Sequence, residues 1–159
     1  MTVTILTAAL IAMVVLAVGG ASTKIGSWYG NLKKPSWNPP NWVFGPAWTI
    51  ILGLAAWSGV LAWSNVATSR QHLVIAVLFA ANIVCHMLWS PLFFNMRRPD
   101  LALIEVPFLW LSILALMGYL SNISSLAVLL LLPYLIWVSF AFLLNLKIVQ
   151  LNRPFGRSF

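Results

Sequence analysis

The stretch WYGNLKKPSWNPPNWVFGPAW, residues 28–48, decides the fold of this chain. It holds four tryptophans, four prolines and two adjacent lysines between long apolar stretches. Proline fixes φ and lacks an amide donor, so no ordinary helix can run through Leu32–Asn41. A stiff, aromatic and basic segment of this kind is either an anchor at a membrane surface or a lid over a pocket. Function is therefore sought here first.

The remainder of the chain is too apolar for a soluble domain. Of its 159 residues, 62% are hydrophobic and 7% are charged, with a mean hydropathy of +0.96. Five apolar stretches approach or exceed the roughly 20 residues that cross a bilayer as a helix. They are Val3–Thr23, Pro46–Ser64, His72–Asn95, Leu101–Leu120 and Leu126–Lys147.

The alternating pattern of a membrane β-barrel is absent, so the apolar stretches predict helices. We expect an all-α fold, an integral membrane bundle of five transmembrane helices forming a single domain over residues 1–159. Within it, residues 24–45 form the connection that acts as a pocket lid, because loops of that length are usually functional. Residues 148–159 are expected to form a polar tail.

The net charge of +7 follows the expected topology. Arg70 alone belongs to one side of the predicted bundle, and all other basic residues belong to the opposite side. These are Lys24, Lys33, Lys34, Arg97, Arg98, Lys147, Arg153 and Arg157. The positive-inside rule then places the first and third loops and the C-terminus in the cytoplasm. Membrane lipid is the expected partner of these charges, and nucleic acid is not.

Three predicted helices carry stripes of aromatic, small and polar residues at helical spacing. A stripe of this kind either lines a cavity or packs and hydrogen-bonds between helices, and the spacing leaves both interpretations open. The third helix presents Asn82, His86, Trp89 and Phe93; the fifth presents Trp137, Ala141, Leu144 and Asn145; the second presents Trp48, Leu52 and Ala55.

Glu105 is the only carboxylate within an apolar stretch. An ionisable group at membrane depth is a functional hypothesis by default. Arg98 lies seven residues earlier on the same helix face, so a structural ion pair or snorkelling to the surface is an equally good explanation. Prolines at 91, 107 and 133 fall inside predicted helices and can open a cavity by kinking them.

The sequence contains no arrangement of nucleophile and base, no metal-ligand cluster and no phosphate-binding loop. We therefore expect no catalytic residue, no metal and no cofactor. Ala76 and Ala80 of the third predicted helix, and Ala55 and Gly59 of the second, have the small-xxx-small spacing of close helix contacts. This spacing predicts a homodimer that uses the third helix, with close helix packing within the chain as the alternative.

Four motifs together resemble the TspO/translocator protein family (TspO/MBR), the peripheral-type benzodiazepine receptors. They are Trp-Tyr-x-x-Leu-x-Lys-Pro-x-Trp-x-Pro-Pro-x-Trp at Trp28–Trp42, Gly-Pro-x-Trp at Gly45–Trp48, Trp-x-Pro-x-Phe-Phe at Trp89–Phe94, and Pro-Tyr-Leu-x-Trp…Leu-Asn at Pro133–Asn145. They occur in order over nearly the whole chain, which makes the combination highly specific.

The resemblance implies a homodimeric five-helix protein that binds porphyrins, sterol-like lipids and benzodiazepine-type compounds beneath its first loop. The implied pocket residues are Tyr29, Trp37, Trp48, Leu52, His86, Trp89, Trp137, Ala141 and Leu144. Two positions are notable. His86 stands where the family usually has Asn, and Glu105 stands where an acidic residue, often Asp, is found. The family's sterol motif is missing, because Tyr134 is far from Lys147.

These observations predict a membrane receptor or binding protein for porphyrin-type tetrapyrroles, with a role in tetrapyrrole handling or stress signalling. Its location is a bacterial membrane, or the mitochondrial outer membrane if the chain is eukaryotic. One rival is a light-dependent porphyrin-degrading enzyme in which pocket tryptophans react. Another is a transporter of tetrapyrroles or sterols.

Overall fold

A computed structural model describes residues 1–155 of the chain as helices joined by short connections. The elements are α1 (Thr2–Ser22), α2 (Ser27–Asn31), α3 (Asn41–Ser64), α4 (Ser69–Ser90), the π-helical turn η1 (Pro91–Asn95), α5 (Pro99–Leu120) and α6 (Ser125–Asn152). These described residues contain no β-strand. The all-α class is therefore confirmed.

Five helical segments are long and apolar enough to cross a membrane. They are α1, α3, α4 continued by η1, α5 and α6, with lengths of 21 to 28 residues. At about 1.5 Å of rise per residue, each of them exceeds the roughly 30 Å of a bilayer's hydrocarbon core. The predicted five-helix membrane bundle is confirmed.

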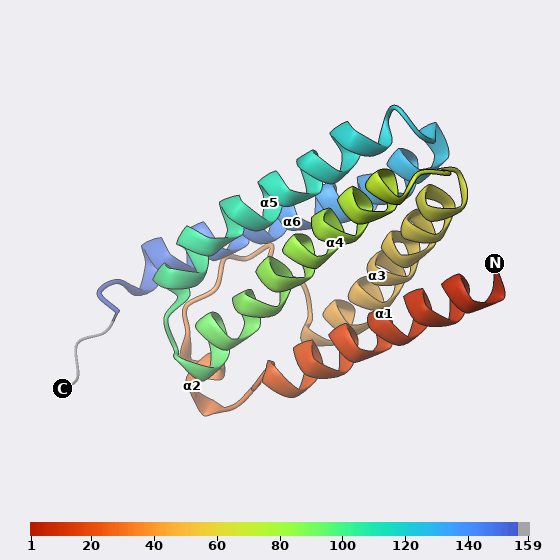
Figure 1. The fold of residues 1–159 in the computed structure, drawn as a ribbon. Helices are drawn as coiled ribbons and strands as arrows, with labels where there is room; N and C mark the ends of the chain where they lie inside the picture. Colours follow the sequence, from red (N-terminus) through yellow and green to blue (C-terminus); the bar gives the residue numbers. More distant parts are fainter. Residues whose placement is uncertain (156–159) are drawn as a thin grey trace.

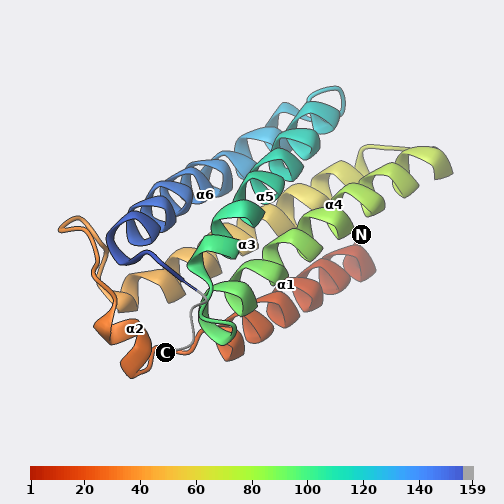
Figure 2. The same cartoon turned by 90° about the vertical axis from the view of Figure 1, so that its left-hand side faces the viewer.

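The order of helices around the bundle is α1, α3, α6, α5 and α4, and α4 returns to α1 (Figures 1 and 2). The chain neighbours α5 and α6 pack tightly. The chain neighbours α3 and α4 touch only lightly, because α3 packs mainly on α1 and α6. A short loop between two helices fixes their antiparallel direction but not their packing partners.

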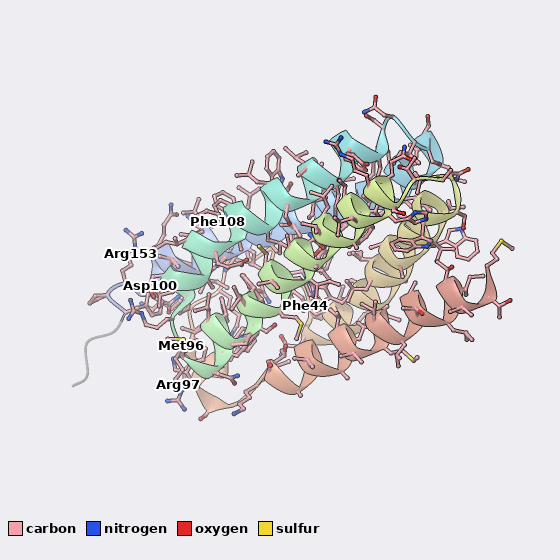
Figure 3. The ribbon with its side chains drawn as sticks, viewed as in Figure 1. Phe44, Met96, Arg97, Asp100, Phe108 and Arg153 are labelled. Carbon is pink, nitrogen blue, oxygen red and sulfur yellow. The ribbon has the colours of Figure 1, made fainter. Side chains whose placement is uncertain are left out.

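The two ends of the bundle differ. Figure 1 shows α2, the first connection and the C-terminal end of α6 at one end, and the N-terminus of α1 at the other. Figure 3 places Arg97 and Arg153 at the end that carries α2, with Asp100 close by. The described basic residues other than Arg70 belong to loops and helix ends on this side, as the sequence predicts. Arg157 lies outside the described residues.

The tightest packing lies between α5, α6 and the inner faces of α3 and α4. Fully buried side chains of this core include Ile113, Leu116, Leu120, Leu131, Tyr134 and Val138. By contrast, α1 buries only Val15. The first helix is consequently the wall of the bundle that is least held by packing.

Two predicted boundaries are wrong. The second span begins at Asn41 and not at Pro46, because Pro46 costs only one backbone bond close to the helix start. The last helix continues to Asn152, so residues 148–152 are helical and do not belong to a polar tail. Residues 156–159 of the predicted tail lie outside the described part. The short helix α2 inside the first connection was not predicted.

Two of the three predicted internal prolines lie inside regular α-helices, and the third marks a change of helix type. Pro107 and Pro133 lie within α5 and α6. Pro91 marks the change from α4 to the π turn η1, where the Met96 amide donates to the Pro91 carbonyl at 2.9 Å. The wider turn brings Phe93 and Phe94 into the interior, where they are 2% and 8% exposed.

Candidate functional site

The lid end of the bundle contains a cavity of about 540 Å³, which is within the range of ligand pockets, about 300–1,000 Å³. All membrane-spanning segments and α2 contribute to its wall. Eight of the predicted site residues line it: Tyr29, Trp48, Leu52, His86, Trp89, Trp137, Ala141 and Leu144. The structure thus brings together residues that lie more than 100 positions apart in the chain.

Trp48 is the centre of an aromatic group in this wall. Its ring lies 4.7 Å from that of His86 and 6.2 Å from that of Trp137, both in edge-to-face arrangement. The first residues of α3 place Trp48 opposite α4 and α6. Edge-to-face pairs are favourable because the positive edge of one ring meets the negative face of the other. The rings of the Trp48 group therefore support one another in the cavity wall.

A second aromatic group surrounds Trp89 where α4 passes into η1. Trp89 stacks on Phe93 with ring centroids 5.0 Å apart and an interplanar angle of 26°. The ring of Tyr29 in α2 lies beside those of Phe93 and Phe94, with ring centroids 6.3 Å and 5.4 Å apart. The π turn and α2 thus form one packed corner, and this corner ties the lid to the bundle.

A polar network runs behind the Trp48 group. The Tyr134 hydroxyl lies 3.2 Å from His86 Nδ1 and 3.3 Å from Asn82 Oδ1. Asn82 in turn donates to Ser112 Oγ at 2.8 Å. The network joins α4, α5 and α6 and satisfies groups that would be costly to bury alone. Asn82 therefore makes interhelical hydrogen bonds, and it also lines a second cavity on the α1 side of the bundle.

The imidazole of His86 both takes part in interhelical hydrogen bonding and lines the cavity. One ring nitrogen takes part in the network, while Nε2 has no protein partner among residues 1–155 and the ring lines the cavity. His86 also lines a second cavity of about 480 Å³ between α1, α3 and α4. The imidazole therefore lies in the wall that the two cavities share, together with Val15 and Leu52.

The lid is held by contacts of its two lysines. The Lys34 ammonium donates to the backbone carbonyls of Tyr29 and Leu32 and lies 4.2 Å from the centre of the Tyr29 ring. The Lys33 backbone makes two hydrogen bonds with the Asn152 side chain, at 2.9 Å and 2.8 Å. Lys34 therefore stabilises the lid internally, whereas the Lys33 side chain is exposed.

Burial at this corner shifts the pKa values of two side chains. Desolvation raises the pKa of the Tyr29 hydroxyl, and the nearby Asn38 side chain partly opposes the shift. Desolvation lowers the pKa of the Lys34 ammonium, although this side chain is largely accessible. Both shifts have the direction expected when the charged form loses water.

Trp37 is the one predicted site residue that does not line the cavity. Trp37 is 47% exposed, and its ring packs edge-to-face with that of Phe140, with ring centroids 5.7 Å apart. Phe140 contacts Trp137 at 5.6 Å, so a single ring separates Trp37 from the cavity wall. The proline-rich stretch places Trp37 on the outer side of the lid.

Asn145 and Phe44 line the cavity although neither is among the predicted site residues. Phe44 lies between the helices in Figure 3, and its ring packs edge-to-face with that of Trp137, with ring centroids 5.9 Å apart. Asn145 is 1% exposed; in the orientation that satisfies its amide it donates to the Pro99 carbonyl and accepts from the Leu103 amide, each at 3.1 Å. Its helical spacing from Trp137 was the signal that could have identified it.

Glu105 does not pair with Arg98. Arg98 instead forms an ion pair with Asp100, with a distance of 2.6 Å from Nη2 to Oδ2. Glu105 is 8% exposed, and neither of its carboxyl oxygens has a hydrogen-bond partner among the described residues. The predicted ion pair and the snorkelling alternative are both excluded by this burial.

The fold and the cavity together define a class: a multi-pass membrane protein with an aromatic cavity at one end of its helical bundle. Comparison with known proteins agrees with this class. The sequence profile of the TspO/MBR family matches residues 6–151. The chain belongs to the TspO/MBR family.

Named relatives come from bacteria and from mammals. The chain is 41% identical over 153 residues to the tryptophan-rich protein TspO of Chlorobaculum tepidum, covering 93% of this chain and 97% of the relative. It is 39% identical to the tryptophan-rich sensory protein of Cereibacter sphaeroides, covering 89% of each chain. It is 32% identical to the human translocator protein, covering 74% of this chain and 70% of the relative. The protein is thus an integral membrane protein of TspO type.

Proposed function

We propose that this protein is a membrane receptor for porphyrin-type tetrapyrroles, which it binds in the cavity beneath the lid. The observation that carries the proposal is the aromatic wall, in which Trp48, Trp137 and Trp89 border a cavity of about 540 Å³. A flat conjugated macrocycle matches such a wall, because each ring contact adds roughly 0.5–1.5 kcal/mol beyond burial.

Polar groups of the cavity suit the remaining chemistry of this ligand class. The free Nε2 of His86 can meet a pyrrole nitrogen, and the exposed ammonium of Lys33 at the lid can attract a propionate carboxylate. Lys34 is less suited to this role because its ammonium already serves the lid. Exposed lysines in the first connection, Lys24 and Lys33, at the same end as a largely apolar cavity, favour an amphiphilic ligand over a fully apolar one.

A spectroscopic titration of the purified protein tests the proposal. Protoporphyrin, a linear bilin and a sterol are added separately, and tryptophan emission and porphyrin absorbance are recorded. We expect saturable quenching by the porphyrin, because bound macrocycle lies against Trp48 and Trp137. Saturable binding of the sterol alone would favour the lipid-binding alternative, and no saturation with any of them would reject the cavity as the site.

The contact between Trp48 and Trp137 also supports a second candidate, photo-oxidative degradation of the bound porphyrin. These two indoles, with ring centroids 6.2 Å apart in the cavity wall, could react with a photoexcited ligand that lies against them. Illumination of the complex distinguishes the two functions. A receptor returns the porphyrin unchanged after extraction, whereas an enzyme converts it to new products with repeated turnover. Flux into sealed vesicles tests the transporter alternative in the same preparation.

A further inference from the structure

Two buried polar side chains near the cavity lack partners in the described structure. The indole nitrogen Nε1 of Trp89 is a donor without an acceptor, and both carboxyl oxygens of Glu105 are acceptors without a donor. Among residues 1–155 the only other such side-chain atom is Asn38 Oδ1, an acceptor in the lid. Unsatisfied groups of this kind are rare because the lost hydration is not replaced.

The packing of α4 on α5 places these two side chains at the same level. The hydrogen bond from Asn82 Nδ2 to Ser112 Oγ, at 2.8 Å, fixes the register of the two antiparallel helices. Trp89 follows Asn82 by seven residues, and Glu105 precedes Ser112 by seven residues. Seven residues are two turns, about 10 Å along the axis, and return to nearly the same face. Trp89 and Glu105 therefore face each other across the same interface.

Other partners for the Glu105 carboxyl are engaged elsewhere. Arg98, the basic residue expected to reach it, is held by Asp100 through two hydrogen bonds at 2.8 Å and 2.6 Å. The Asn82 amide donates to Ser112, and the Tyr134 hydroxyl donates to Asn82. Trp110, the other tryptophan of α5, donates to Ser139 at 3.0 Å. The Trp89 indole N–H is the one buried side-chain N–H or O–H donor that remains unpaired among the described residues.

We infer that the Glu105 carboxyl accepts the indole N–H of Trp89, and that Glu105 thereby positions this indole in the cavity wall. Rotation of the two side chains closes the bond without a change in helix register. A carboxyl oxygen accepts a hydrogen bond whether the group is neutral or ionised. Trp89 lines the cavity and stacks on Phe93, so its orientation sets the shape of that corner. Glu105 is a positioning residue that acts through Trp89.

The indole signals of the ligand-free protein test this inference directly. In a ¹H–¹⁵N correlation spectrum, the Trp89 signal is identified by its loss in Trp89→Phe. Glu105→Leu removes the acceptor, so the Trp89 signal should move in the direction of an unbonded indole. Glu105→Gln keeps a side-chain oxygen, so the signal should stay close to its original position.

Trp110 supplies the matched control on the same helix, since its indole already has a partner. Its signal should move in Ser139→Ala and stay unchanged in Glu105→Leu. An unmoved Trp89 signal in Glu105→Leu overturns the inference. If Glu105→Leu does not fold, the wild-type spectrum decides, because a Trp89 signal at the unbonded position, compared with the bonded Trp110, overturns it equally.

A binding measurement connects the inference to the cavity, and this part rests on the proposed function. We expect Glu105→Leu to raise the protoporphyrin Kd by about three- to tenfold, the effect of one lost hydrogen bond, and Glu105→Gln to raise it by less than about twofold. Unchanged affinity in Glu105→Leu with a shifted Trp89 signal would refute the effect on the cavity. A wild-type protein that binds no porphyrin would refute the proposed function and leave the indole result standing.

Discussion

At the residue scale, Trp48 and Trp137 have side chains whose neighbours explain their orientation. The two rings meet at nearly a right angle, and both residues line the cavity. Trp48 also contacts His86 and Tyr134, so its position depends on α4 and α6 as well as on α3. A change at either tryptophan should therefore alter ligand contact without removing the packing of the helix that carries it.

We expect Trp48→Phe and Trp137→Phe each to raise the protoporphyrin Kd, by up to about tenfold, because a smaller ring loses roughly 1–1.5 kcal/mol of stacking. The measurement is quenching of the remaining tryptophans, with thermal unfolding as a check of the fold. Trp57→Phe is the control, since Trp57 is 46% exposed and lines neither cavity. Equal affinities in all three variants would place the ligand elsewhere.

The individual site residues were predictable where a helix carries them. Trp48, His86, Trp89 and Trp137 lie on stripes whose spacing the sequence shows, and the structure brings these stripes to one cavity. Trp37 belongs to a proline-rich stretch without helical periodicity, so no spacing could tell which side of the lid it faces. The pairing of Arg98 with Asp100 was also missed, because the loop geometry that favours the nearer carboxylate is not visible in a helix pattern.

At the element scale, the lid combines a proline-rich strap with two fixed points. One is Tyr29, which is 6% exposed in the corner formed by Phe93 and Phe94. The other is the pair of hydrogen bonds between the Lys33 backbone and the Asn152 side chain. The second fixed point exists only because α6 extends to Asn152, beyond the end predicted from the apolar stretch.

Removing the second fixed point should loosen the lid. We expect Asn152→Ala to cost about 1 kcal/mol of lid closure and to speed porphyrin dissociation about fivefold. Stopped-flow displacement measures the rate, and trypsin cleavage after Lys33 measures exposure of the strap. Asn122→Ala is the control, because Asn122 bonds the Gly118 carbonyl in the turn before α6, at the other end of the bundle. A dissociation rate equal to that of the wild type would show that Tyr29 alone holds the lid.

Helix identity followed from the sequence, whereas helix neighbours did not. Runs of apolar residues indicate membrane spans whatever their partners, so all five were found. The order around the bundle depends on side-chain fit between helices that are far apart in the chain, and a single sequence gives little information about that fit. The helix α2 was missed because five residues next to a proline-rich stretch carry no periodic signal.

At the scale of the whole molecule, the basic residues mark one end of the bundle. We expect the C-terminus to face the cytoplasm and the N-terminus to face away from it, because seven of the eight described basic residues are on the lid side and only Arg70 is on the other. Reporters of compartment fused to each terminus measure this orientation. A cytoplasmic N-terminus would contradict it.

Association can be tested on the outer face of α4. Ala76 and Ala80 are exposed and line the second cavity beside α1, so they remain open to a second copy. We expect Ala76→Leu combined with Ala80→Leu to convert a detergent-purified homodimer to monomer, because larger side chains separate the helix backbones. Light scattering corrected for detergent gives the mass.

Ala115→Leu on the exposed side of α5 is the control and should leave the mass unchanged. A dimer that survives the double substitution would exclude this face of α4. Gly59 of α3, which also has small-xxx-small spacing, already contacts α4 within the chain. A Cβ at that position would lie 3.3 Å from the Phe79 ring, so Gly59 serves close packing of α3 on α4.

Because α1 buries few residues, the ligand concentration that sets occupancy of the cavity should be the concentration in the membrane. Residues of α1 line both cavities, yet this helix buries only Val15, so the barrier between the binding cavity and the surrounding lipid is thin. Under the proposed function, a tetrapyrrole dissolved in the membrane would reach the site from the side, without crossing water. Occupancy would follow the amount of ligand per lipid and not the amount per litre of buffer. Diluting the same protein and ligand into more vesicles should lower saturation even when every aqueous concentration is unchanged.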